Sequence, residues 1–564
     1  MDKQEELKRL KKRFETVWQE RKNDMDDHCK QIALHVLPVA MRAITGDKKH
    51  DRAAHRKIVD STGKDSLKIL AAGMLSGTCS PSRPWFVLSV ADLKLKKDIE
   101  VKQWLDTVKD VMYAEFARSN VYRAVHHCYM QECAFGTGAA LMPEHDSGEP
   151  LMNLIPLTFG EYALTTDSYN RPNGVFREFE LSVENIVERF GIDNVSDNIR
   201  NQHEQKKYDQ LHTIWHVIEK RVNPDPADKS SRGKPWGSYY FEKAAQEKFL
   251  SISGFDYFAA VCPRWNVTGI DTYGESPASD AIGDLNALQK AHLQLAKGTD
   301  YAINPPLLLP KSLKGQERQV LPNGLAFYDP APGIQGQQVH PMITVKPDYQ
   351  GVFLTINAAQ ERVRKTFHAD LFLMMDNFDK TNMTATEVAE RKNEKMLLLG
   401  PILDRQNDEM LRPLVERCFS RVITAYPELL DEAPEQLSDT EIKIEFVSIL
   451  AQAQKAAGNA AMERLLAMVG QLVQFDQGIM DKFDTEAFID EYADNVGAPA
   501  SVMRGAKKIQ QIREARAAQQ AQMQQAALDQ QQSQEGLNDA NAIKALADAS
   551  ATAEQTPDPM ADMV

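Results

Sequence analysis

Three short polar motifs have the residue types of a nucleophilic serine site. Ser61–Lys64 (STGK) has SxxK spacing, Ser196–Asn198 is an SDN triplet, and Lys380–Asn382 (KTN) resembles a KTG triplet. Together such motifs supply a serine nucleophile and its proton-transfer partners in serine acyltransferases. The third motif has Asn382 where glycine is needed, and chance accounts for three short patterns in a chain of 564 residues. A serine acyltransferase-like enzyme is therefore only a remote alternative.

Two other motifs suggest metal or nucleotide chemistry. His126, His127, Cys128 and Cys133 are soft ligands close together in sequence, but on a predicted helix neighbouring side chains point about 100° apart. Gly136–Gly138 (GTG) lacks the third glycine of a dinucleotide fingerprint and follows a helix instead of a strand, so a helix stop is expected there. The sequence predicts no catalytic residue, no cofactor and no metal site, and we expect that the chain is not an enzyme.

Composition describes an ordinary globular chain large enough for several domains. Hydrophobic residues make up 43% and charged residues 26% of the chain, which excludes a collagen-like or wholly disordered protein. The net charge of −14 excludes a protein that grips nucleic acid over a broad basic surface. Six scattered cysteines without a CxxC pair predict reduced thiols. The charged start has no secretory signal and the apolar runs are short, so no membrane association is expected.

Hydrophobic spacing predicts helices followed by an α+β region in the first half of the chain. Leu7, Leu10, Phe14 and Val17 form a helical stripe, and later stripes predict four more helices before residue 136. Short strands are expected at 155–157, 162–164, 174–181, 211–222 and within 249–261, with the turn between two of them at 171–174 and a helix after Ser182.

Two long predicted helices bracket a segment that cannot be helical. Ser276-Pro277 is a strong start signal for the first helix, and residues 301–347 contain eight prolines. A second helix follows from 348, then a polar loop at 376–383, and then a capping box at Thr384–Glu387. The helix that begins there is expected to bend at Pro401 and Pro413. A strand near 442–447 and an Ala/Gln-rich helical segment complete the pattern.

The order of these segments resembles the portal protein, or head-to-tail connector, of short-tailed bacteriophages of the podovirus type. The motifs that carry the resemblance are Asp60-Ser61-Thr62 followed by LAAGMLSGTCSPSRPWFVL (70–88), then FGTGAAL (135–141), the blocks 155–191 and 273–288, and the block 383–419. They cover most of residues 1–430, and their order is more specific than any one of them. The Gln-rich end carries no matching motif.

The resemblance implies an α+β, mainly helical portal fold, assembled as a dodecameric ring around an axial channel. Its parts would be N-terminal helices and wing (1–275), first stem helix (276–300), clip (301–347), second stem helix (348–375), tunnel loop (376–383), wing helix and return strand (384–449), helical crown (450–532) and a mobile tail (533–564).

The resemblance also implies a function and partners. Double-stranded DNA would pass through the channel during packaging into the capsid and during ejection, and the ring would join the head to the tail in the virion. Expected partners are further copies of the chain, a terminase packaging ATPase, tail adaptor proteins, and capsid and scaffold proteins, with assembly in the host cytoplasm. The alternative is another helical virion structural or scaffold protein, although such a protein needs no insert between long helices.

Three groups of candidate site residues follow from the implied architecture. The candidate tunnel loop that contacts DNA comprises Asn377, Asp379, Lys380, Thr381 and Asn382. Stem residues expected near the channel are Arg362, Arg364, Lys365 and His368. The expected docking rim of the clip comprises Lys311, Lys314, Glu317 and Arg318.

Overall fold

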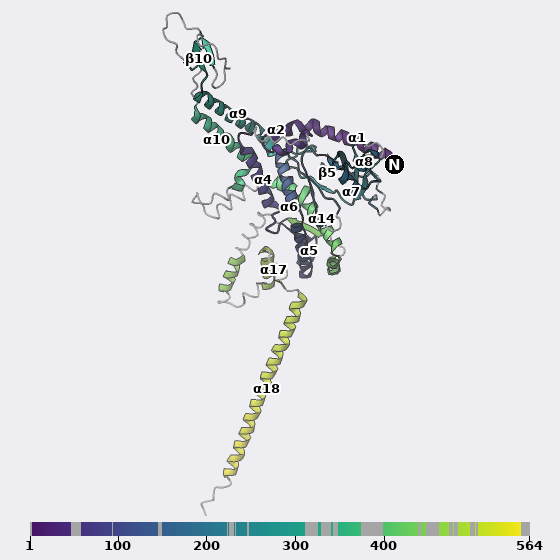
Figure 1. The fold of residues 1–564 in the computed structure, drawn as a ribbon. Coiled ribbons are helices and arrows are strands. Elements are labelled where there is room, and N and C mark those ends of the chain that lie inside the picture. The colour runs from purple at the N-terminus through teal and green to yellow at the C-terminus, as the bar shows by residue number, and fades with distance from the viewer. Residues whose placement is uncertain are drawn as a thin grey trace, which may run out of the picture. The chain divides into compact units, whose positions relative to one another are not determined.

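The computed structural model in Figure 1 is mainly helical, with four small or medium sheets among the described residues. It describes residues 3–46, 58–310, 325–328, 340–341, 348–373, 399–437, 442–446, 462–472, 478, 483–496, 502–503 and 506–553, apart from 93, 145–148, 223, 225–229, 232 and 245–247. The chain forms two compact units. One comprises 1–88, 108–431 and 444–479, and the other comprises 89–107, 432–443 and 480–564.

A five-stranded antiparallel sheet lies in the first unit. Its strands, in spatial order, are β4 (Tyr162–Thr166), β5 (Pro172–Ser182), β6 (Leu211–Lys220), β7 (Trp236–Glu242) and β8 (Ser251–Phe255). Helix α1 (Lys3–Arg21) lays its apolar stripe on one face, where Phe14 stacks on Trp215 with ring centroids 4.1 Å apart. Successive side chains of a strand point to opposite faces of the sheet, so alternate apolar residues of β5, β6 and β7 form the face that α1 covers. The predicted strands and the first helix are therefore confirmed.

Two short helices cover part of the opposite face of this sheet. They are α7 (Val183–Phe190) and α8 (Asp197–Glu204), which pack around Ile214 of β6. The Ser182 hydroxyl accepts a hydrogen bond from the Asn185 amide, and that of Ser196 accepts from the Ile199 amide. Each serine thereby satisfies an amide that the first turn of a helix leaves open. The predicted cap at Ser182 is confirmed.

The turn between β4 and β5 lies earlier than the sequence predicted. Residues 171–174 were the expected turn, but Pro172 already begins β5 and the chain reverses at 167–171. The Asp167 carboxylate accepts hydrogen bonds from the amides of Tyr169 and Arg171, and Asn170 takes a positive φ of 57°. An aspartate that closes the turn with its side chain outweighs the Pro-Asn-Gly signal.

Helices α2 (Asp27–His35), α4 (Thr62–Thr78) and α6 (Val121–Phe135) pack together in the centre of the first unit. Helix α6 ends at Gly136, as expected, with a φ of 79°. A Cβ at Gly136 would lie 1.8 Å from the Gly274 carbonyl oxygen, so only glycine fits this close approach. A small sheet, β3 (Ile155–Leu157), β2 (Ala139–Leu141) and β9 (Ala260–Val261), continues from that point.

Two long helices run side by side and lead to a short sheet (Figure 1). They are α9 (Pro277–Ile303), which Ser276 caps, and α10 (Tyr349–Thr366). Strands β10 (Leu307–Pro310), β11 (Leu325–Tyr328) and β12 (His340–Pro341) form the sheet between them in sequence, in the order β11-β10-β12. The predicted non-helical segment between two long helices thus contains strands.

The second long helix is shorter than predicted. The expected helix reached residue 375, but α10 ends at Thr366 and a new turn of helix, α11 (Ala369–Leu373), begins after His368. His368 has a φ of 51°, which breaks the helical hydrogen-bond ladder. No proline or glycine marks this break in the sequence.

The remaining described helices have the two expected prolines near their starts, while the predicted helix start at Thr384 lies outside the described residues. Helix α13 (Gly400–Gln406) has Pro401 in its first turn, and a π-helical turn at Asn407–Leu411 joins it to α14 (Arg412–Ala425), which has Pro413 in its first turn. Helix α15 (Pro427–Asp431) and strand β13 (Ile442–Phe446) come next.

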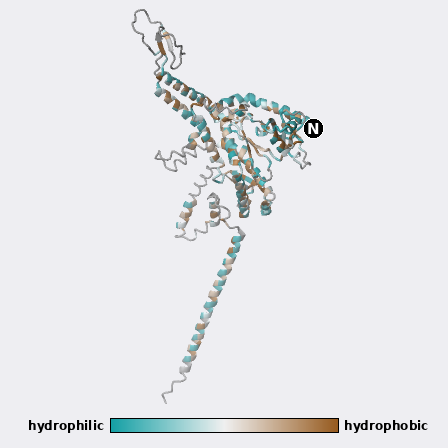
Figure 2. Ribbon diagram, viewed as in Figure 1, coloured by the Kyte–Doolittle hydropathy of each residue, from teal (hydrophilic) through white to brown (hydrophobic). Residues whose placement is uncertain are grey.

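The second unit contains α17 (Thr485–Val496) and the 48-residue helix α18 (Ala506–Ala553). Helix α18 continues past residue 532, where the sequence analysis placed the end of the helical part. Its Ala- and Gln-rich composition favours helix and contains no proline. Figure 2 shows hydrophilic and hydrophobic residues mixed along α18.

Candidate functional site

The α9–α10 pair is joined by a narrow apolar seam. Leu288 of α9 packs against Ile356 and Ala359 of α10, and Ala291, Leu295 and Val352 flank them. The spacing of three, four and seven residues places these side chains on facing stripes.

Gln289 of α9 fastens the pair to the segment that begins α4. Its amide oxygen accepts hydrogen bonds from the backbone amides of Val59 (2.8 Å) and Asp60 (3.1 Å), and its amide nitrogen donates to the Asp60 carbonyl oxygen (2.8 Å). Gln289 is buried, and so is Asp60. A buried side chain that satisfies three backbone groups fixes α9 against the start of α4.

The Asp60 carboxylate binds α4, α9 and α10 together. It accepts hydrogen bonds from the Thr62 amide (2.9 Å) and the Gln360 side chain (2.8 Å), and lies 3.1 Å from Nε2 of His292. Burial raises the pKa of this carboxyl, but the hydrogen bonds from Thr62 and Gln360 outweigh burial and leave the pKa below its ordinary value. The ionised carboxylate is therefore the form that holds the three helices.

The four predicted stem residues lie at the C-terminal end of α10 and just beyond it, in different environments. Arg362 makes an ion pair of 2.7 Å with Asp284 of α9, and Lys365 makes one of 2.8 Å with Glu361. Arg364 is exposed and makes no ion pair within the described part of the chain. Of the three cations, only Arg364 lacks a matched charge there.

His368 is partly buried beside Trp265. Its ring lies 6.5 Å from that of Trp265 in a stacked arrangement, and burial lowers its pKa. Just beyond it, Phe372 of α11 lies against Gly73 of α4, where a Cβ would come within 2.4 Å of the ring. Because the φ of His368 turns the chain, α11 packs on α4 and does not continue along α9.

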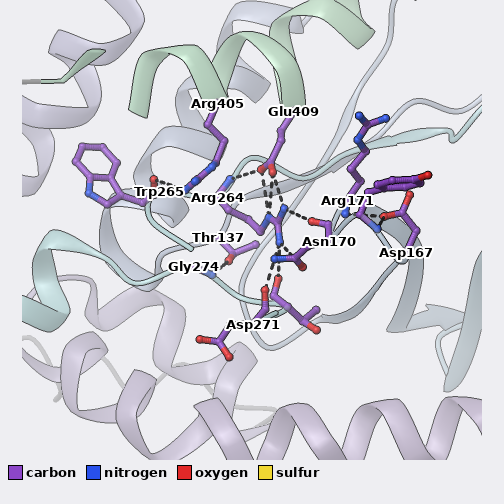
Figure 3. A network of polar contacts seen from close by, with 12 residues as sticks. Thr137, Asp167, Asn170, Arg171, Arg264, Trp265, Asp271, Gly274, Arg405 and Glu409 are labelled. Atoms are coloured by element: carbon purple, nitrogen blue, oxygen red, sulfur yellow. Dashed lines mark hydrogen bonds and ion pairs between the residues drawn. The ribbon is translucent and has the colours of Figure 1, made fainter. Parts of the chain in front are cut away.

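A second polar centre joins the α13–α14 segment to the rest of the first unit (Figure 3). Arg264 is buried and makes an ion pair of 2.6 Å with Glu409 in the π-helical turn. Its guanidinium also donates to the Asn170 carbonyl oxygen (2.6 Å), and its backbone amide donates to Glu409 (3.0 Å). Arg405 donates to the Trp265 carbonyl oxygen. Because Arg264 is buried, its charge-assisted hydrogen bonds to Glu409 hold the π-helical turn in one orientation.

Glu132 of α6 extends this centre into the core. Gln406 donates to its carboxyl group, and the side chain is fully buried. Burial raises the pKa of Glu132 well above its ordinary value, and the nearby charge of Glu409 adds to the effect. The sequence analysis missed Arg264, Glu132 and Glu409, because the partners are 142 to 277 residues apart or lie on a helix of unremarkable pattern. A charged residue within an apolar helical stretch, such as Glu132, was the one available signal.

The motifs tested for catalysis have local structural partners. The Ser61 hydroxyl donates to Asp65, and the Ser196 hydroxyl donates to Glu242. Cys128 and Cys133 are buried, and burial raises the pKa of both thiols. No group of three metal-ligating side chains comes together within the residues that the structure describes. All six cysteines are free and buried, in accord with the predicted reduced thiols.

Two groups of candidate residues lie outside the described residues. They are the tunnel-loop residues Asn377, Asp379, Lys380, Thr381 and Asn382, and the clip residues Lys311, Lys314, Glu317 and Arg318. Among the helices that are described, none is both long and apolar enough to span a bilayer.

The α9–α10 pair exposes large apolar side chains. Leu293 and Ile303 of α9 are 47% and 69% exposed, and Phe353 and Leu354 of α10 are 51% and 65% exposed. Tyr349 at the start of α10 is a further exposed apolar side chain of the pair, at 38%.

Comparison with known proteins identifies the family. Residues 7–503 match the family described as bacteriophage head to tail connecting protein. The chain belongs to this family. It is 38% identical over 516 residues to the "Probable portal protein" of Bordetella phage BPP-1, covering 91% of this chain and 92% of that protein. It is 34% identical over 511 residues to the "Portal protein" of Salmonella phage epsilon15, covering 90% and 91%.

The resemblance predicted from the sequence is thereby confirmed, and with it a structural place in the virion where head and tail connect. Among solved structures, a chain from the virion of a native gene transfer agent particle aligns over 73% of this chain and 86% of its own length. Its sequence identity is 15% and its TM-score 0.34, which is too low to carry an argument.

Proposed function

We propose that the chain is the subunit of the portal vertex, a dodecameric ring that packages double-stranded DNA into the capsid, later releases it, and joins the head to the tail. The observation that carries the proposal is the α9–α10 pair, which brackets a segment that contains strands β10, β11 and β12 and exposes apolar residues on both helices. The family membership and the two portal relatives support it. In this arrangement α9 and α10 form the stem, and 301–347 form the clip.

The exposed apolar residues fit a stem that packs against neighbouring subunits. Leu293, Ile303, Phe353 and Leu354 would be buried between adjacent copies, because obligate interfaces are more apolar than an ordinary surface. The Asp60 centre would hold each stem pair at a fixed angle to its own wing, so that twelve copies close into a ring.

The charges of the stem fit a conduit that does not trap DNA. Each neutralised phosphate releases counterions and adds affinity, so a basic lining would hold DNA in place. Arg362 and Lys365 already have acidic partners, and the chain carries a net charge of −14. Arg364 in each subunit, with Lys380 of the predicted tunnel loop, would then provide the few cationic contacts.

The ends of the ring would meet different partners. We propose that the clip rim, with Lys311, Lys314, Glu317 and Arg318, docks the terminase packaging ATPase and later the tail adaptor proteins, while capsid and scaffold proteins contact the opposite part. The ATPase supplies the energy for packaging, and this chain supplies the channel.

Electron microscopy of the purified full-length chain tests the proposal directly. Class averages should show a ring with a central hole, and native mass spectrometry should give twelve copies. A chain that stays monomeric at physiological salt and micromolar concentration would refute the proposed function. Deleting residues 311–340 provides a second test, because the rings should then persist but fail to bind the packaging ATPase.

A further inference from the structure

The α9–α10 pair carries an exposed leucine on the outer edge of α9. Leu293 is 47% exposed. It lies two residues from Ala291 and two from Leu295, which both belong to the seam between the helices. Since two residues turn an α-helix through about 200°, Leu293 points away from α10.

Leu354 has the same relation to the seam on α10. It is 65% exposed and lies two residues from Val352 and two from Ile356, which both pack in the seam. Leu354 therefore points away from α9, for the same reason. The pair is thus a ribbon of two helices in which each outer edge carries one leucine.

The two leucines lie at the same level along this ribbon. The chain runs outward along α9 and returns along α10 (Figure 1), and Arg362 pairs with Asp284 across the two helices at 2.7 Å. Leu293 is nine residues beyond Asp284, and Leu354 is eight residues before Arg362. At 1.5 Å per residue these are about 13.5 and about 12 Å in one direction, so the two levels differ by only about 1.5 Å.

Matched edges at one level favour a second copy of the chain as the partner. Rotation about a ring axis that runs along the ribbon keeps every level unchanged, so the Leu293 edge of one copy meets the Leu354 edge of the next. Such a head-to-tail contact joins two different surfaces and covers both leucines in every copy. A two-fold dimer would set one edge against itself and leave the other exposed, and a foreign protein would have to cover two separate edges.

The polar residues beside the leucines are compatible with this contact. Lys290 and Lys297 lie about one turn to either side of Leu293, and both are exposed. By the same count of levels, their counterparts on α10 are Asn357 and Gln350, which are also exposed. Neither counterpart carries a charge, so each lysine meets no like charge at its own level. Like charges placed together across an interface would oppose association.

We propose that Leu293 of one copy packs against Leu354 of the next copy around the ring. The contact rests on the proposed ring and goes beyond it, because it states which edge of the stem meets which and at what level. Burying two leucine side chains in each interface removes apolar surface from water. The repeated contact would hold neighbouring stems in register, so that their clip ends lie at one height.

Disulfide trapping tests the contact in the full-length chain. A disulfide needs Cα atoms about 4.4 to 6.8 Å apart, and all six native cysteines are buried. Rings of Leu293→Cys/Leu354→Cys oxidised with diamide should give covalent oligomers up to the whole ring on a non-reducing gel. Each single variant should stay monomeric on that gel, because neither edge meets itself. Rings that mix the two single variants should give covalent dimers and nothing larger.

Leu293→Cys/Lys365→Cys is the matched control. Lys365 is exposed and lies eleven residues from Leu354, which is three helical turns, so it is on the same edge of α10. Its level is about 16 Å away, which is too far for a disulfide. The control should form rings without covalent oligomers, and oligomers as abundant as those of the test pair would overturn the matched level.

A double-mutant cycle gives a second and independent measurement. Native mass spectrometry on dilution follows ring dissociation, and circular dichroism checks that each variant folds. Leu293→Ala and Leu354→Ala should each raise the concentration at half-dissociation about fivefold or more. Because both changes remove the same contact, the double variant should raise it by clearly less than the product of the two single effects.

The outcomes separate this contact from the proposed function. A wild-type chain that forms no ring would overturn both proposals. Rings of Leu293→Cys/Leu354→Cys that give no covalent oligomers would overturn the contact alone, as would two alanine effects that simply multiply in the double variant.

Discussion

Gln289 and Asp60, 229 residues apart in sequence, are joined by two backbone-to-side-chain hydrogen bonds: the Gln289 amide accepts from the Asp60 amide and donates to the Asp60 carbonyl. This is the pattern by which one strand pairs with another, here made by a single side chain. The Asp60 carboxylate also accepts a hydrogen bond from Gln360 of α10. Asp60 therefore contacts both long helices, α9 and α10. In the proposed ring, Asp60 would link the stem helices to the rest of the subunit.

Gln289→Ala should loosen this link. It leaves the backbone amides of Val59 and of the buried Asp60 without their acceptor, which should cost about 1 to 3 kcal/mol of unfolding free energy. Chemical denaturation gives that value, and hydrogen exchange should show faster exchange at the start of α4. Gln294→Ala, an exposed position on the same helix, is the control and should change neither. An equal effect at both positions would contradict the role of Gln289.

Glu132→Gln should stabilise the protein at neutral pH. The pKa of Glu132 is raised in the folded chain, so the folded state binds a proton that the unfolded state releases above its ordinary pKa near 4.5. Wild-type stability should therefore fall as pH rises above about 4.5, while the neutral glutamine keeps the bond to Gln406. The gain should therefore grow as the pH rises from 4 to 8. Unfolding measured from pH 4 to 8 tests this, and a gain that does not vary with pH would contradict the buried, protonated carboxyl.

Removing the Glu409 side chain should lower the free energy of unfolding. Glu409→Ala leaves the buried Arg264 guanidinium without its counter-charge, which should cost about 3 to 5 kcal/mol. The neighbouring Asp408 pairs with Arg412 on the surface, so Asp408→Ala should have little effect. Thermal unfolding of the two variants side by side gives the comparison. Equal melting temperatures would show that the π turn does not depend on the buried pair.

Gly136→Ala should prevent correct closure of the loop after α6. The added Cβ would overlap the Gly274 carbonyl oxygen, and the positive φ adds backbone strain. Soluble yield and melting temperature should both fall. Gly77→Ala is the control, since a Cβ there meets nothing within 4 Å and alanine favours helix. If Gly136→Ala behaves like this control, the close approach is not needed for folding.

The sequence predicted local structure better than long-range contacts. Ser276-Pro277 marked the start of α9 and Ser182 the start of α7, because caps act within one turn. The break at His368 had no local signal, since a histidine with positive φ is set by tertiary packing. The Arg264–Glu409 pair could not be predicted, because nothing in a single sequence relates residues 145 positions apart. Asp60 belongs to one of the motifs that carry the family resemblance, but its partners Thr62, Gln360 and His292 on three helices were seen only in the structure.

Arg364→Glu should impair DNA passage without disturbing assembly. Arg364 is exposed and has no ion pair in the described part of the chain, so its reversal breaks no ion pair there but places a negative charge in the proposed channel in every copy. Repulsion of phosphates there should reduce the amount of DNA packaged, and a lower salt concentration should make the defect larger, because salt screens the repulsion. Packaged DNA is measured by nuclease protection, and ring number by native mass spectrometry. Lys365→Gln is the matched control, since Glu361 already balances that charge on the same helix face. Intact rings that package DNA at wild-type levels with Arg364→Glu would place this residue away from the channel.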